Sequence, residues 1–152
     1  MEALHSRIRL RWALSRFVLA AVVGAIVAVV LVQFDRPALY GVAPGALVFA
    51  IGLGHALLLY RSWGFELDAD ALELERGVLT QVETAVPFVR IQHVDTQRGP
   101  LDRLLGLSSV VVYTAGSRGA DVTIPGLAPD RARDLRNRLR DLAIESEPED
   151  AV

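Results

Sequence analysis

Two long apolar segments separated by only three residues constrain the fold of this chain more than any other feature. They cover residues 17–34 and 38–60, which are 18 and 23 residues long. As helices with a rise of about 1.5 Å per residue they would measure about 27 and about 35 Å, and the hydrocarbon core of a bilayer is about 30 Å thick. We therefore predict a transmembrane hairpin over residues 17–60, with its turn at Asp35, Arg36 and Pro37.

Two other interpretations of these segments fit less well. A cleavable signal peptide has an apolar core of about 7–15 residues, whereas the first segment is longer and a second one follows it. A buried helix of a soluble protein is amphipathic, whereas residues 38–60 contain no Asp, Glu, Lys or Arg. Uncleaved membrane spans remain the better interpretation.

The charges around the hairpin predict its orientation. Residues 1–16 carry four arginines and one glutamate, Arg61 follows the second segment, and Arg36 is alone in the turn. Because loops rich in Arg and Lys stay in the cytoplasm, we expect a multi-pass protein of the cell membrane with both termini cytoplasmic.

The first sixteen residues form a basic amphipathic juxtamembrane segment. Leu4, Ile8 and Trp12 recur at four-residue spacing among arginines, which is typical of a short interfacial helix. This segment either sets the topology alone or also binds lipid headgroups. The expected membrane-surface residues are Arg7, Arg9, Arg11, Trp12 and Arg16.

Small residues within the hairpin predict close helix packing. They are Ala20, Gly24 and Ala28 in the first segment and Gly41 and Gly45 in the second. Such stripes allow helix backbones to approach closely, either within the hairpin or in a dimer. His55 is interpreted as a residue hydrogen-bonded within the hairpin, with a proton relay as the alternative.

After residue 60 the pattern changes to the alternation of β-strands. Strands are predicted over residues 63–67, 72–75, 82–86, about 89–96, 110–114 and 121–124, with a short helical turn at 101–105. An amphipathic helix begins near Pro129. Residues 61–144 are thus expected to form an α+β domain of six antiparallel strands closed by a C-terminal helix. Residues 145–152, which are acidic and without periodicity, are expected to be a disordered tail.

The segment from Pro87 to Leu107 resembles the central signature of a known family. Its R-I-Q strand and the following G-P-L-x-R-L-x-G-L comprise Arg90, Ile91, Gln92, Gly99, Pro100, Leu101, Arg103, Leu104, Gly106 and Leu107. Together with the preceding hairpin, this motif is similar to that of the bacterial membrane-flanked PH domain family, the YdbS-like proteins. The resemblance implies a PH-like antiparallel β-barrel closed by the C-terminal helix. It also implies a larger relative with several such domains as a partner.

The same signature supplies the candidate interaction residues. Arg90, Gln92, Arg98 and Arg103 are candidates for a patch that meets a lipid headgroup or an acidic partner. The alternative is structural: Gly99 and Pro100 fix a turn, and the leucines at 101, 104 and 105 form a hydrophobic plug. Acidic residues around Asp68 and Asp70 in the first hairpin disfavour phosphoinositide binding there. The net charge of −5 over residues 61–152 disfavours nucleic acid.

No arrangement in the sequence favours catalysis. The chain has no cysteine, all 16 of its basic residues are arginines, and His5, His55 and His93 are far apart in sequence. We therefore expect no cofactor and a non-enzymatic interaction module that self-associates or docks another membrane protein. Its partners would be membrane lipids, a second copy of the chain or the larger PH-domain relative. The alternatives are a sensor of anionic lipids and an accessory subunit of a transporter or channel.

Overall fold

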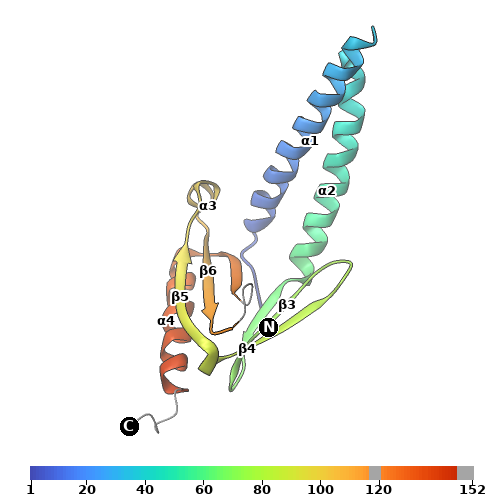
Figure 1. The fold of residues 1–152 in the computed structure, drawn as a ribbon. Coiled ribbons are helices and arrows are strands. Elements are labelled where there is room, and N and C mark those ends of the chain that lie inside the picture. Colours follow the sequence, from blue (N-terminus) through green and yellow to red (C-terminus); the bar gives the residue numbers. More distant parts are fainter. Residues whose placement is uncertain (117–120, 147–152) are drawn as a thin grey trace. The chain divides into compact units, whose positions relative to one another are not determined.

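A computed structural model describes residues 1–116 and 121–146, and these residues fall into two compact units (Figure 1). The first unit is a helical hairpin, Arg9–Arg61. The second combines Met1–Ile8 with the chain from Ser62 onward. The N-terminal residues therefore belong to the domain that follows the hairpin.

The hairpin consists of two long apolar helices. Helix α1 is Ile8–Gln33, the short 3-10 helix η1 is Ala38–Gly41, and α2 is Val42–Ser62. Both helical segments are long and apolar enough to cross a membrane. Most of their large apolar side chains are exposed, which suits lipid as their solvent.

Small residues lie where the two helices touch. A Cβ atom added to Gly41 would lie 2.6 Å from the carbonyl oxygen of Gly24, and one added to Gly45 would lie 3.1 Å from that of Ala20. Ala28 also contacts the Gly41 position. The predicted packing residues thus meet within the hairpin, where the rings of Phe17 and Phe49 form an edge-to-face pair with centroids 5.8 Å apart.

His55 lies on helix α2, where its side chain is exposed. The interpretation of a hydrogen bond within the hairpin, with a proton relay as the alternative, stays a prediction.

Seven strands are described in the second unit, and they form two antiparallel sheets. The first sheet has the order β1-β2-β3-β4, with β1 Glu2–Ala3, β2 Gly64–Leu67, β3 Ala71–Arg76 and β4 Val82–Pro87. The second has the order β5-β6-β7, with β5 Ile91–Gln97, β6 Ser108–Thr114 and β7 Val122–Leu127. The short helices η2, Phe88–Arg90, and α3, Pro100–Leu105, precede and follow β5.

The expected antiparallel strands and C-terminal helix are confirmed, whereas the closed barrel is not. Among the described residues no ladder joins the two sheets, so each keeps two edge strands. Helix α4, Pro129–Glu145, buries Ala132, Leu135 and Leu139 and contacts β5, β6 and η2. The helix supplies the apolar cover that an open sheet of this kind needs.

The six predicted strands are present. The seventh strand, β1, lies at the N-terminus, before the hairpin. Glu2 and Ala3 precede the hairpin in the sequence, and they pair with Phe65 and Gly64, which follow it. A two-residue strand carries no periodic signal, and its partner is about 60 residues away. Sequence reasoning therefore had no means of placing it.

The expectation of a short interfacial helix through the first sixteen residues is corrected by this pairing. Leu4 and Ile8 are buried in the domain, and the amide of His5 donates to the carbonyl of Gly126 at 2.8 Å. Gly126 has φ +66°, and an added Cβ would lie 2.7 Å from that of Ile8. The apolar spacing thus reflects a domain core up to Ile8 and helix α1 after it.

Polar contacts also attach the first residues of the chain, Met1 and Glu2, to the domain. The guanidinium of Arg131 in α4 donates to the Glu2 carboxylate through Nε at 3.2 Å and through a second nitrogen. This hydrogen bond, together with the charge of Glu2, raises the pKa of Arg131. The Met1 amine lies 3.1 Å from the Glu66 carboxylate. These contacts hold the N-terminal end of β1 to the domain.

The C-terminal tail was predicted to begin at residue 145. Helix α4 includes Glu145, and Ser146 follows as its cap. Residues 147–152, which make up most of that predicted tail, lie outside the described residues.

Candidate binding groove between β5 and α4

A groove of about 480 Å³ runs between β5 and α4. The strand contributes residues 91–95 to its lining, and the helix contributes Arg136, Arg140, Ala143 and Ile144. Successive residues of a strand point to opposite faces of the sheet. Five consecutive residues line the groove, and the register of β5 against β6 shifts between Ile91 and His93, so the groove borders the edge of β5 at this irregularity.

The topology explains why this edge is accessible. Strand β5 pairs with β6 from Ile91 through Gln97 and has no second strand beside it in the described sheet. The helix packs through Leu135 and Leu139, which are fully buried. Arg136 and Arg140 each follow one of these leucines by one position, so the packing of α4 turns both arginines toward the groove.

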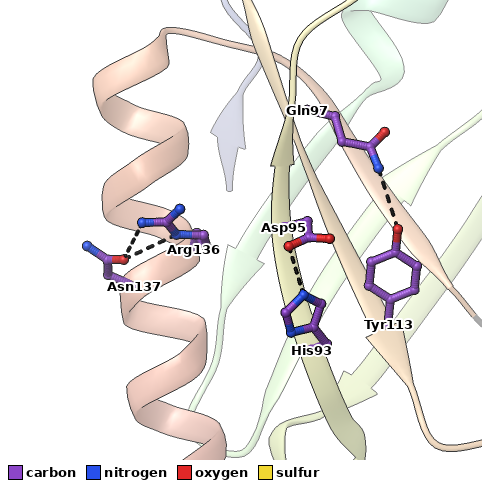
Figure 2. Close-up of polar contacts among 6 residues, drawn as sticks. All are labelled: His93, Asp95, Gln97, Tyr113, Arg136 and Asn137. Carbon is purple, nitrogen blue, oxygen red and sulfur yellow. Dashed lines mark hydrogen bonds and ion pairs between the residues drawn. The ribbon is translucent and has the colours of Figure 1, made fainter.

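The charges in the groove are predominantly positive. Arg136 donates to the side-chain oxygen of Asn137 at 3.0 and 3.3 Å, which is a neutral partner (Figure 2). Arg140 has Asp141 at 3.8 Å, a long contact between two exposed side chains. On the strand side Asp95 lies 2.8 Å from Nε2 of His93.

Tyr113 and Gln97 are two further polar residues of this sheet. The amide of Gln97 donates to the Tyr113 hydroxyl at 3.4 Å, and the His93 ring lies 5.9 Å from the Tyr113 ring (Figure 2). His93, which lines the groove, therefore lies between a carboxylate and an aromatic ring.

The structure separates the predicted interaction residues. Gln92 lines the groove, while Arg90 precedes β5 and Arg98 follows it. At about 3.3 Å per residue the seven-residue strand puts about 23 Å between the latter two. Nε of Arg98 donates to the carbonyl of Leu107 at 3.0 Å, where it ties together the ends of β5 and β6.

The segment around α3 departs from the expected hydrophobic plug. Leu104 is 78% exposed and Leu101 36% exposed, so neither fills the core. The turn itself is stabilised as predicted: Asp102 accepts from the amide of Gly99 at 3.1 Å, and Gly106 has φ +65°. Arg103 is exposed on the same short helix.

Sequence reasoning missed the helix side of the groove. Arg136, Arg140 and Ile144 are spaced by four residues, and Ile144 is an exposed large apolar residue. That spacing was a usable signal for a second functional face of α4. The apolar stripe of this helix alone enters the sequence-based prediction, which assigns no role to its arginines.

The described residues contain no group of three or more His, Asp or Glu side chains positioned to hold a metal ion. The predicted membrane-surface residues are divided between the two units: Arg7 belongs to the domain, where it donates to the carbonyl of Leu105 at 3.3 Å. The others lie on α1, where Arg9 stacks over the Tyr60 ring at 4.9 Å. Their contact with lipid stays a prediction.

Comparison with known proteins identifies the family. Residues 14–143, which include most of α1, all of α2 and most of the domain, match the bacterial PH domain family. The chain belongs to this family. It is also similar to the UPF0699 transmembrane protein YdbS of Bacillus subtilis (strain 168), with 32% identity over 84 residues.

The alignment with that relative covers 55% of this chain and 51% of the relative, so the chain spans about half the length of the curated protein it matches. No solved structure gives a significant match. The family, the transmembrane relative and the two apolar helices together make this bacterial PH domain protein a membrane protein with two candidate spans.

Proposed function

We propose that the protein is a non-enzymatic, membrane-anchored docking module whose PH-like domain binds other membrane proteins at the cytoplasmic face. The observation that carries this proposal is the groove between β5 and α4. It combines an accessible strand edge with exposed cationic and apolar side chains. Such surfaces are used to recognise segments of other proteins.

The hairpin supports the same function by confinement. A domain joined directly to a membrane span stays within a few nanometres of the bilayer, which raises its effective concentration for other membrane proteins. A groove with moderate affinity for its partner can then suffice for binding, because the effective concentration of the domain is high.

The cytoplasmic placement is part of the proposal. It is supported by the arginines on both sides of the hairpin against the single Arg36 in its turn. The partner would be a second copy of this chain or a larger membrane protein with PH-like domains.

The test is recovery of partners from native membranes. Full-length protein and a hairpin-only variant, residues 9–61, are cross-linked in cells, purified in mild detergent and analysed by mass spectrometry. We expect membrane proteins that the full chain recovers and the hairpin does not. Identical protein sets from both, or recovery of lipid alone, would reject docking through the domain.

Sensing of anionic lipid is the second candidate, and exposed Leu104 beside Arg103 on α3 favours it. Full-length protein in nanodiscs of neutral lipid is mixed with vesicles of phosphatidylcholine or with vesicles containing anionic phosphatidylglycerol. Lipid sensing predicts binding to the anionic vesicles that falls steeply with salt and weakens in Arg103→Ala. Equal recovery with both vesicle types would speak against it.

A further inference from the structure

We propose that the groove between β5 and α4 binds an extended acidic segment of a partner protein, which adds to β5 as a fourth strand of the β5-β6-β7 sheet. This inference rests on the proposed docking function and specifies its ligand. It is argued from the strand edge, the charges and the apolar residues of the groove.

The strand edge supplies the first part of the argument. An edge strand presents a row of backbone amide and carbonyl groups along the side that lacks a neighbouring strand. In this domain the groove follows five consecutive residues of β5, so its floor includes that backbone row. A peptide in extended conformation can pair with it, which is the mode known as β-augmentation.

The groove leaves open space between β5 and α4. Helix α4 lies on the sheet through buried Leu135 and Leu139, while Ala143 and Ile144 line the groove. A volume of about 480 Å³ is enough for several residues of an extended chain beside β5.

The charges select an acidic segment. Arg136 and Arg140 are separated by one helical turn and line the groove side by side. Asp95 is the carboxylate on the strand side, and it already has His93 at 2.8 Å. Two guanidinium groups against one paired carboxylate favour Glu or Asp side chains on the incoming strand, because guanidinium binds carboxylate in a bidentate manner.

The apolar residues add a second requirement. Ile144 is 61% exposed, and Ile91 and Ala143 lie beside it in the groove. Since the side chains of a strand alternate, a matching segment would place acidic residues toward the arginines and at least one apolar residue near Ile144. We expect a short motif in which acidic and apolar residues are mixed.

Site-specific photo-cross-linking in native membranes tests the inference. A photoreactive phenylalanine replaces Gln92, an exposed residue of the groove, in the full-length chain. Glu73, exposed on β3 of the other sheet, is the matched control position. We expect the Gln92 position to cross-link to a segment of another protein that is rich in Glu and Asp, as read by mass spectrometry of the linked peptide.

Two double variants test the role of the arginines. Arg136→Ala with Arg140→Ala removes the groove cations, and Arg133→Ala with Arg138→Ala removes two arginines of α4 that do not line the groove. We expect the first pair to lower the cross-linking yield at least tenfold and the second pair to leave it unchanged. Equal melting temperatures of the two variants verify that the fold is intact.

The outcomes separate this inference from the proposed function. Cross-links from Gln92 to a segment without acidic residues, to the chain's own residues 147–152, or to lipid would overturn the inference, as would a yield insensitive to the groove arginines. Cross-links to a membrane protein from Glu73 alone would leave docking in place and remove the groove as its site. The absence of cross-links from both Gln92 and Glu73 would contradict both the inference and the proposed docking function.

Discussion

At the scale of single residues, glycine decides how closely the two apolar helices pack. In lipid there is no hydrophobic force between helices, so contact depends on close approach of the backbones and on van der Waals packing. Gly24, Gly41 and Gly45 supply that approach here, since a Cβ at any of the three would meet backbone atoms of the other helix within 3.1 Å. The stripe of small residues is therefore used within one chain.

Gly41→Ala tests this packing. The added methyl group would overlap the Gly24 carbonyl and Ala28, and we expect a loss of about 1–3 kcal/mol in hairpin stability. Thermal unfolding of the purified protein in detergent measures the effect. Gly54→Ala is the matched control, because nothing lies within 4 Å of its added Cβ. Equal melting temperatures for both variants would show that the close contact at Gly41 does not stabilise the hairpin.

Glu2 and Arg131 allow a prediction of pH dependence. Glu2→Gln should reduce domain stability by at most about 1 kcal/mol, since both side chains are more than one third exposed and the ion pair is screened. Glu2 raises the pKa of Arg131, so the stabilisation from the charged arginine is complete below the pKa that arginine has in the unfolded chain. It is lost only as the pH rises through the higher pKa of the folded state.

The effect of Glu2→Gln should therefore be the same at pH 6 and pH 9, as measured by denaturant unfolding. Glu145→Gln, at the exposed end of α4, is the control for removal of a carboxylate and should change stability little. A loss that doubled between the two pH values would refute the assignment to this pair.

At the scale of elements, the seven N-terminal residues before α1 are a component of the domain. Leu4 is 3% exposed, and it directly follows β1, which is an edge strand of the first sheet. Leu4→Ala should cost about 2–4 kcal/mol of domain stability, because it leaves a cavity in the core.

Leu79→Ala is the control for that substitution, since Leu79 is 96% exposed in the β3–β4 loop. Hydrogen exchange of the β2 and β3 amides measures domain opening in each variant. An interfacial helix at the N-terminus would predict no change for Leu4→Ala, so equal exchange in both variants would restore the original interpretation.

Most elements of this fold could be predicted because their signals are local. The apolar runs, the alternating strands and the α4 stripe each lie within one continuous stretch of at most 23 residues, and the signature around Gly99 and Pro100 fixes the β5–β6 connection. Strand β1 and the groove could not be predicted in this way. Both depend on segments that are about 40 to 60 residues apart in sequence and meet only in the folded domain.

At the scale of the whole molecule, β1 determines how the chain must cross a bilayer. Residues 1–8 and the domain from Ser62 onward form one compact unit, while the hairpin between them forms another. Both ends of the hairpin must therefore lie on the same side of the membrane, and the turn at residues 34–37 on the other. The arginine distribution favours the cytoplasm for the domain, which is the orientation that we propose.

Cysteine labelling tests this arrangement without interference, because the chain has no cysteine of its own. A cysteine at Leu79, in an exposed loop of the domain, should resist a membrane-impermeant maleimide in intact cells and react after permeabilisation. One at Arg36, in the turn, should react in intact cells. The reverse pattern would invert the orientation and exclude cytoplasmic docking. Labelling of both cysteines in intact cells would contradict the two crossings, since a turn and a domain separated by one membrane span cannot face the same compartment.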